Sequence, residues 1–288
     1  MTDTDTHPHT DADALLARKT WRTLEPLHGM IYFVPEAAEA YAGIGITGRS
    51  GYFASRAAPM GAVGAEVVIA TFFNFNPELV RHAIPAAWDV ASPAQLVAAR
   101  FAAVDAAFRR IPGDEVVGSA DMARASELAR IAAAQASERT EGRPLAAAHA
   151  ELAWPREPHL VLWHAQSILR EFRGDGHIAQ LVVHGLSGLE SLVTHAAAGD
   201  VPANILLATR AWSEADWRQA QDELRRRGWL EQGDELRFTA AGTQRRQQIE
   251  DGTDALAAGP YAALGDERCA ELRALVRPWS KAFAEHLR

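Results

Sequence analysis

The chain repeats one stretch of its own sequence. Shifting the sequence by 138 positions, so that Ala58 falls on Ala196, places residues 58–71 on residues 196–209 without a gap. Six positions are identical in the two copies: Ala58/Ala196, Gly61/Gly199, Val63/Val201, Ala65/Ala203, Ala70/Ala208 and Thr71/Thr209. Each copy runs from a helix end through a glycine turn into a short apolar segment. We therefore predict a built-in pseudo-dimer, with a seam between its halves where a small molecule can sit.

The composition is that of a globular protein with room for two domains. The chain has 288 residues, 48% of them hydrophobic, and a net charge of -8; its isoelectric point is about 5.8. This acidity disfavours a surface that coats nucleic acid, although a local basic patch is compatible with it. Because Cys269 is the one cysteine, an internal disulfide and a cysteine-based zinc site are excluded.

The first residues and the hydropathy predict a soluble, cytoplasmic protein. Residues 1–11 are polar and acidic and lack the regions of a signal peptide, so we expect a disordered tail that includes His7 and His9. No apolar run in the sequence approaches the roughly 18 residues of a membrane span, and no membrane partner is expected.

Proline, glycine and capping residues predict the order of the helices. We expect an N-terminal repeat at 12–111, a helical linker at 112–156 and a C-terminal repeat at 157–288. The first repeat is degenerate, because its helix from Asn76 to Ile84 is short and has prolines at 77 and 85.

Three signals organise the second repeat. The run Gly174-Asp175-Gly176 predicts a turn after a first helix, with Asp175 as the N-cap of a new helix from His177 to His184. Capping boxes then begin helices at Ser187 and Ser213. The stretch from Trp229 to Phe238 predicts a short β-hairpin with a Gly-Asp tip, and Thr239 caps the helix that follows.

Residues 199–258 resemble a MarR-type winged helix. The segment from Ser213 to Arg227 is similar to the recognition helix of that family. The strings Arg227-Gly-Trp-Leu230 and Phe238-Thr-Ala-Ala-Gly242 resemble the residues that close this helix and follow the wing. The resemblance implies a mainly α-helical fold of the α+β class with small β-wings, in which tandem winged-helix repeats form a MarR-like pseudo-dimer.

A second resemblance covers nearly the whole chain. It is to an actinobacterial helix-turn-helix family of about 280 residues, and it implies a fold but brings no activity. The strings that carry it are Gly51-Tyr-Phe-Ala-Ser-Arg-Ala-Ala-Pro59, Ala70-Thr-Phe-Phe-Asn-Phe75, Leu162-Trp-His-Ala165, Leu169-Arg-Glu-Phe-Arg-Gly-Asp-Gly-His177 and the pair Thr253-Asp254.

The expected recognition helix is poorly suited to DNA. It begins with Ser213-Glu-Ala-Asp216, and these carboxylates would face phosphates and electronegative groove edges. The expected wing, residues 231–235, is acidic as well. If the protein reads DNA nevertheless, we expect Arg218 and Gln219 at bases and Arg225 at phosphate. The same charge pattern also stabilises an isolated helix through its dipole.

Polar side chains in otherwise apolar helices are the candidate ligand site. Two pairs share helix faces, and a third group surrounds the glycine turn. Arg56 or Arg173 is expected to hold an anionic group, and His177 or His28 to move a proton, unless the residues form a structural network. Phe72, Phe73, Phe75 and Trp88 wall either an apolar pocket or the core. The candidate ligand-binding and catalytic residues are His28, Tyr32, Tyr52, Arg56, His164, Arg170, Arg173, Asp175 and His177.

Two function classes remain open. We expect a small-molecule-binding protein that does not read DNA, and leave open whether it is an enzyme acting on a small anionic or carbonyl metabolite. The alternative is a ligand-responsive MarR-like transcriptional regulator. No cofactor is expected, because the chain lacks phosphate-binding and nucleotide-binding motifs. A metal site from His28, His164 and His177 is disfavoured by their spacing. The protein is expected to be a monomer or a homodimer.

Overall fold

The computed structural model describes residues 10–286, which form two compact units. Of these residues, unit 1 contains 10–39, 100–176 and 253–286, and unit 2 contains 40–99 and 177–252. All four boundaries fall inside helices, which are α2 (Pro35–Ala42), α7 (Pro93–Arg110), α11 (Pro158–Val183) and α15 (Ala240–Leu256). The predicted division of the chain into a first repeat, a linker and a second repeat, at residues 12–111, 112–156 and 157–288, stays a prediction.

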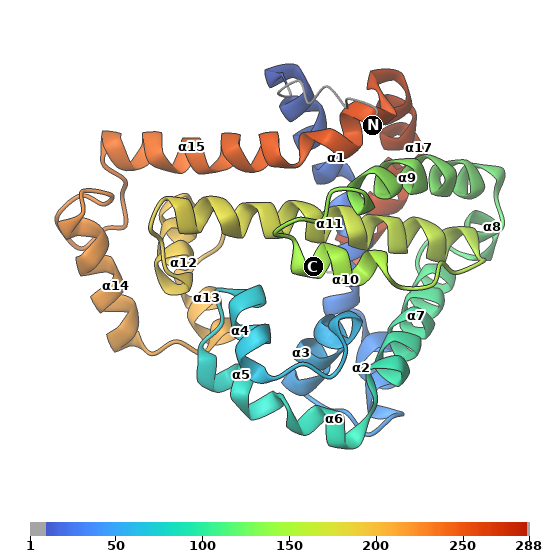
Figure 1. Ribbon diagram of the computed structural model, residues 1–288, viewed down its shortest axis with the longest axis horizontal. Coiled ribbons are helices and arrows are strands. Elements are labelled where there is room, and N and C mark those ends of the chain that lie inside the picture. Colours follow the sequence, from blue (N-terminus) through green and yellow to red (C-terminus); the bar gives the residue numbers. More distant parts are fainter. Residues whose placement is uncertain (1–9, 287–288) are drawn as a thin grey trace, which may run out of the picture. The chain divides into compact units, whose positions relative to one another are not determined.

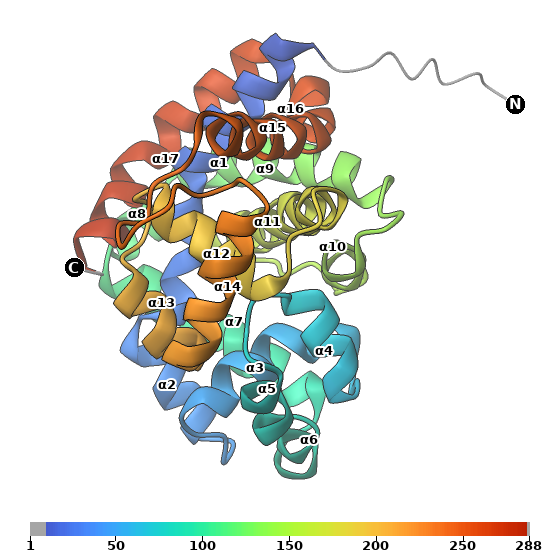
Figure 2. The same ribbon diagram turned by 90° about the vertical axis from the view of Figure 1, so that its left-hand side faces the viewer.

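Unit 1 is built around the first and last helices of the chain. Helix α1 packs against α16 and α17, and α9 packs against the same two helices (Figure 1 labels α1, α9 and α17, and Figure 2 labels α16). Leu24 and Leu27 of α1 and Leu272 and Val276 of α17 are fully buried. The helices wholly inside unit 1 are α1 (Asp11–Gly29), the 3-10 helix η1 (Met30–Tyr32), α8 (Asp114–Val117), α9 (Ala120–Ser137), α10 (Pro144–Ala150), α16 (Ala258–Leu264) and α17 (Asp266–His286).

Unit 2 contains two groups of short helices. In one group α5 packs against α3 and α4, and in the other α12 packs against α13 and α14 (Figure 2). The core of the second group includes Trp217, Leu224 and Trp229. The helices wholly inside unit 2 are α3 (Arg49–Ala57), the 3-10 helix η2 (Ala58–Met60), α4 (Ala65–Phe72), α5 (Pro77–Ala83), α6 (Ala86–Val90), α12 (Gly188–Ala197), α13 (Ala203–Arg210) and α14 (Glu214–Arg226).

The two similar sequence segments contain the same local structure. Gly61 and Gly199 have φ values of 82° and 77°, which glycine adopts without strain. Each is followed by an eight-residue helix, α4 or α13. Phe73 and Ala211 then end these helices with φ values of 61° and 58°, and they are the two non-glycine residues with positive φ among residues 10–286.

The turns after α4 and α13 hydrogen-bond to each other. Trp212 Nε1 donates to the carbonyl oxygen of Asn74 at 3.0 Å. In return, the Asn76 backbone nitrogen donates to Arg210 O, and Asn76 Nδ2 donates to Ala211 O, both at 3.0 Å. These bonds hold the two helical groups of unit 2 together at their turns.

The prediction of an α+β winged-helix fold is wrong. The described residues are helices and connecting segments without a strand; the expected wing is reduced to one antiparallel bridge between Leu230 and Phe238. The wing residues between them, 231–235, are exposed and largely charged. Because a two-stranded hairpin needs more pairs or a packed apolar face, these residues do not extend the bridge into strands.

The predicted turn at Gly174-Asp175-Gly176 is also wrong. Helix α11 runs without a break from Pro158 to Val183 and includes all three residues. A Cβ atom on Gly176 would lie 2.9 Å from Arg143 Nη1 and 3.3 Å from Leu256 Cβ. This glycine therefore makes room for neighbouring side chains and does not end the helix.

Two further expectations concern the first residues and the membrane. Residues 1–9 of the predicted tail, with His7 and His9, lie outside the described residues, whereas Asp11 begins α1 behind a capping box at Thr10. Across residues 10–286, none of the helices combines the length and the apolar character that crossing a membrane requires.

Candidate functional site

The structure distributes the predicted site residues over both units. His28, Tyr32, His164, Arg170, Arg173 and Asp175 belong to unit 1, and Tyr52, Arg56 and His177 belong to unit 2. Catalysis by His28 and His177 stays a prediction. That these histidines share one cavity with Arg56 and Arg173 stays a prediction as well.

His28 and Tyr32 meet as expected, around a buried arginine. Arg100 Nη2 lies 3.5 Å from His28 Nε2 and donates to the Tyr32 hydroxyl at 3.5 Å. The His28 ring is parallel to the Trp163 ring at 5.6 Å, and the Arg100 guanidinium lies 5.0 Å from the centre of that ring. Arg100 carries no motif of its own, and Trp163 belongs to the string Leu162-Trp-His-Ala165 but has no ionisable side chain, so neither was among the predicted site residues.

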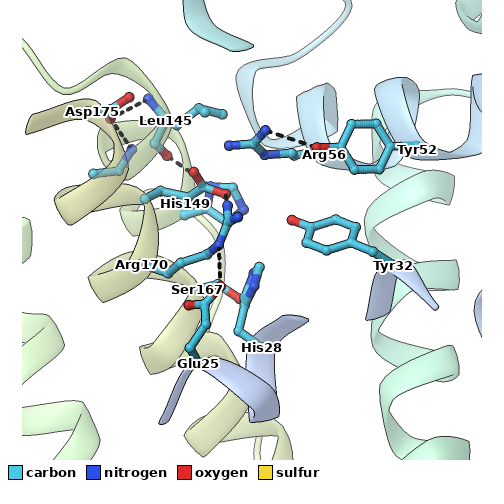
Figure 3. A network of polar contacts seen from close by, with 12 residues as sticks. Glu25, His28, Tyr32, Tyr52, Arg56, Leu145, His149, Ser167, Arg170 and Asp175 are labelled. Carbon is cyan, nitrogen blue, oxygen red and sulfur yellow. Dashed lines mark hydrogen bonds and ion pairs between the residues drawn. The ribbon is translucent and has the colours of Figure 1, made fainter. Parts of the chain in front are cut away.

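Arg170 is held by two carboxylates of unit 1. It donates to Glu25 Oε1 at 3.3 Å and to Glu171 Oε1 at 2.9 Å, and its guanidinium lies 5.6 Å from the Tyr32 ring centre. Figure 3 shows Glu25, His28, Tyr32 and Arg170 close together, contributed by α1, η1 and α11. Both carboxylates were absent from the predicted site, because their pairing with Arg170 depends on packing and not on spacing alone.

Arg173 and Asp175 have partners distant in sequence. Arg173 Nη1 forms an ion pair with Asp254 Oδ1 at 2.9 Å, and Asp254 also pairs with Arg18. Asp175 Oδ2 accepts hydrogen bonds from the backbone nitrogens of Leu145 and Ala146, both at 3.0 Å (Figure 3). The prediction that Asp175 is the N-cap of a helix from His177 to His184 is therefore wrong; its carboxylate caps the start of α10 instead.

Two buried histidines of unit 1 are held in the neutral form. Burial, followed by the charges of Arg170 and Arg100, lowers the pKa of His28 well below its usual value. Burial, followed by His149, lowers the pKa of His164 to about 3. The ring of His164 packs edge-on against Trp154 at 4.7 Å and Phe101 at 5.8 Å, and neither ring nitrogen has a hydrogen-bond partner within residues 10–286.

We expect His164→Phe to weaken the dependence of stability on pH. The unfolded chain takes up a proton at this histidine below pH 6.5, whereas the folded chain does so only near its pKa of about 3. Wild-type stability therefore falls as the pH falls below 6.5, and between pH 6.5 and 5.0 this one site costs about 2 kcal/mol. Urea unfolding at pH 7.5 and 5.0 measures the effect. Parallel pH curves for the two proteins would contradict it, whatever their difference at pH 7.5.

Tyr52 and Arg56 form the expected pair in unit 2. Arg56 Nη1 donates to the Tyr52 hydroxyl at 3.2 Å (Figure 3), and the guanidinium lies 4.3 Å from the centre of the Phe72 ring. The Tyr52 ring also contacts the rings of Phe53 and Phe75. His177 is half-buried in the last third of α11 and does not begin a helix.

A pocket of about 480 Å³ lies within unit 2. One wall consists of Ile69 from α4 and of Phe73, Phe75 and Pro77 around the turn that follows. The other wall comes from the start of α12, from Trp212 and from one face of α14. The residues of this second wall are Ser187, Gly188, Leu189, Glu190, Trp212, Asp216, Gln219, Ala220 and Glu223.

The sequence prediction of this pocket was incomplete. Phe73 and Phe75 line it, as the apolar-pocket alternative proposed, while Phe72 is buried in the core and the Trp88 indole donates to Val63 O. Trp212 was missed, although it occupies the position of Asn74 in the shifted alignment and hydrogen-bonds to that residue.

The arginines of α14 are engaged with acids on the same helix. Arg218 pairs with Glu214 at 3.4 Å and Arg225 with Asp222 at 3.0 Å, while Arg226 pairs with Glu223. Arg225 also donates to the Glu231 carbonyl oxygen. Of the residues expected at DNA, Arg218 is well exposed, Arg225 is held by these contacts, and Gln219 lines the pocket.

Metal-binding side chains do not cluster in the described part of the chain. Across residues 10–286 no three histidine, cysteine or acidic side chains are grouped so that they could hold a metal ion.

Comparison with known sequences decides the family. A sequence model described as a helix-turn-helix family matches residues 17–287. The chain belongs to this helix-turn-helix family. Its α4–α5 and α13–α14 pairs, each joined by a short turn, have the local pattern after which such families are named. No curated protein and no solved structure matches the chain.

Proposed function

We propose that this helix-turn-helix protein binds a small organic molecule in the pocket of unit 2. The observation that carries the proposal is the orientation of α14. In a DNA reader the second helix of the helix-turn-helix enters the major groove. Here one face of α14, with Asp216, Gln219 and Glu223, lines a pocket whose opposite wall is aromatic.

The size and lining of the pocket support this proposal. Ligand sites commonly have volumes of roughly 300–1,000 Å³ and combine apolar walls with a few polar groups. This pocket has about 480 Å³ and three aromatic side chains, Phe73, Phe75 and Trp212. Its polar groups come mainly from α14 and the start of α12, so a bound molecule would contact both helical groups of unit 2.

A ligand-responsive transcriptional regulator is the second candidate. The family match favours it, because helix-turn-helix proteins commonly bind DNA. Three features weigh against it: the acidic start of α14, the acidic segment 231–235, and the ion pairs of Arg218 and Arg225. A ligand that contacts both turns would change their spacing, which would couple ligand binding to DNA binding in this second candidate.

We expect only weak binding to random duplex DNA. The acids at the start of α14 repel phosphate, so the dissociation constant should be no tighter than roughly 10⁻⁵ M at physiological salt, with a shallow salt dependence. Electrophoretic mobility shifts with random duplex and with DNA upstream of the coding sequence measure this. Tight, sequence-specific retention that Arg218→Ala abolishes would establish the regulator and contradict our first choice.

We expect ligand binding to depend on the open volume of the pocket. Gln219 is exposed and lines the pocket, so Gln219→Trp should fill it without disturbing the core. A fragment panel observed by ligand-detected NMR should contain molecules that bind the wild type and lose at least about tenfold in affinity with this variant. Gln221→Trp, at a half-buried position on the same helix outside the pocket lining, is the control. If the panel yields no binder, or if both variants behave alike, the proposal is wrong.

A further inference from the structure

We propose that the molecule bound in the unit 2 pocket is an organic cation with an apolar, ring-sized body. This inference rests on the proposed function and adds the charge of the ligand. The sequence predicts an anionic or carbonyl ligand at Arg56 or Arg173, but neither of these residues lines the pocket.

The charged side chains that line the pocket are all acidic. They are Glu190, Asp216 and Glu223, and the described lining residues include no lysine, arginine or histidine. An anion entering this space would approach three carboxylates, whereas a cation would be attracted by them.

Two of these carboxylates have arginine partners, whereas the third has only hydrogen-bond partners in its capping box. Arg227 pairs with Glu190 at 2.8 Å, and Arg226 hydrogen-bonds to Glu223 and thereby lowers the pKa of its carboxyl group. Asp216 Oδ2 accepts from the backbone nitrogen and hydroxyl of Ser213, but no ion-pair partner for Asp216 is found among residues 10–286. Asp216 belongs to the capping box at the start of α14, and it is the lining carboxylate without an arginine partner among the described residues.

The aromatic wall suits the same chemistry. Phe73, Phe75 and Trp212 line the pocket, and aromatic faces attract ammonium and guanidinium groups. One face of Phe75 is already covered by the Arg210 guanidinium, 4.5 Å from the ring centre, so Phe73 and Trp212 carry this part of the argument. A ligand with a quaternary or protonated amine attached to a ring would match both walls.

The helix end in the pocket does not reverse this preference. Helix α12 begins in the pocket wall, and a helix N-terminus favours anions. Here Glu190 itself supplies that anion: its Oε2 accepts from Ser187 N at 2.8 Å, and Ser187 Oγ accepts from Glu190 N at 3.2 Å. This capping box leaves less of the positive end of α12 for a ligand.

Three probes of similar size test the charge preference. Benzyltrimethylammonium, benzyl alcohol and phenylacetate share one ring and differ in charge. Isothermal titration or NMR titration of the full chain should rank the cation first, at least about fivefold tighter than phenylacetate, since exposed and half-buried charges interact modestly.

Substitutions at one exposed position locate the effect. Gln219→Lys should weaken benzyltrimethylammonium binding roughly two- to fivefold and strengthen phenylacetate binding. Gln219→Glu should strengthen benzyltrimethylammonium binding and weaken phenylacetate binding. Gln221→Lys adds the same charge to α14 outside the pocket lining and should leave both affinities close to those of the wild type.

The possible results separate this inference from the proposed function. If phenylacetate binds as tightly as the cation and Gln219→Trp blocks it, the charge assignment is overturned while small-molecule binding stands. If Gln221→Lys acts as strongly as Gln219→Lys, the preference arises from overall charge, and the pocket assignment is overturned. If neither these probes nor the fragment panel bind, the proposed function itself fails.

Discussion

Replacing Gly188 with alanine is expected to lower the free energy of unfolding by about 2–3 kcal/mol. Gly188 is the first residue of α12, and an added Cβ would lie 2.0 Å from the carbonyl oxygen of Phe73 and 2.9 Å from its carbonyl carbon. These are backbone atoms, so the clash cannot be relieved by rotating a side chain. The helix must move away from the turn after α4, and because Gly188 and Phe73 both line the pocket, ligand binding should weaken as well.

Gly174→Ala is the control for this substitution. Gly174 lies inside α11, where an added Cβ would lie at an ordinary contact distance of 3.6 Å from Glu171 Oε2. Alanine favours helix over glycine by up to about 1 kcal/mol, so this variant should be as stable as the wild type or more stable. Urea unfolding followed by circular dichroism compares the two. Equal stability of Gly188→Ala and the wild type would show that α12 and the turn after α4 are not packed this closely.

Replacing Asp254 with asparagine is expected to cost about 3–5 kcal/mol. Asp254 is 4% exposed and pairs with Arg173, which is 8% exposed and whose guanidinium lies 4.3 Å from the centre of the Trp21 ring. Asparagine keeps the shape of the side chain but leaves the buried guanidinium without this carboxylate. A buried charge that loses its counter-ion is more costly than the pair itself is favourable.

A double variant distinguishes the charge from the shape. Adding Arg173→Met to Asp254→Asn removes the more deeply buried of the two arginines that pair with Asp254, the other being Arg18, and should recover part of the lost stability, which a double-mutant cycle measures. Asp251→Asn, an exposed acid on the same helix, should change stability by less than about 0.5 kcal/mol. A loss of under about 1 kcal/mol for Asp254→Asn would mean that the ion pair with Arg173 contributes little to unit 1.

Local signals in the sequence predicted local structure well. The capping boxes at Ser187 and Ser213 are present, and the Thr239 hydroxyl accepts from the backbone nitrogen of Gly242. These predictions hold because a cap and its helix lie within a few residues of each other. The pairs His28–Tyr32 and Tyr52–Arg56 follow from helical spacing for the same reason.

The same signals misled where a distant segment changed their meaning. The glycines at 174 and 176 favour a turn by themselves, but in the fold Gly176 accommodates Arg143, whose side chain donates to Phe172 O and to Leu256 O. The segment 229–238 has the residues of a hairpin, but it forms a single bridge.

The sequence by itself determined the helical character of most segments, their caps and the family to which the chain belongs. Only the tertiary structure decided which polar groups are partners. Arg173 pairs with Asp254, and Asp175 caps α10. Residues from the segments 69–77, 187–190 and 212–223 line one pocket. All three arrangements depend on contacts between segments far apart in the chain. Helical periodicity shows which side chains share a face, but the packing of whole helices decides what that face meets.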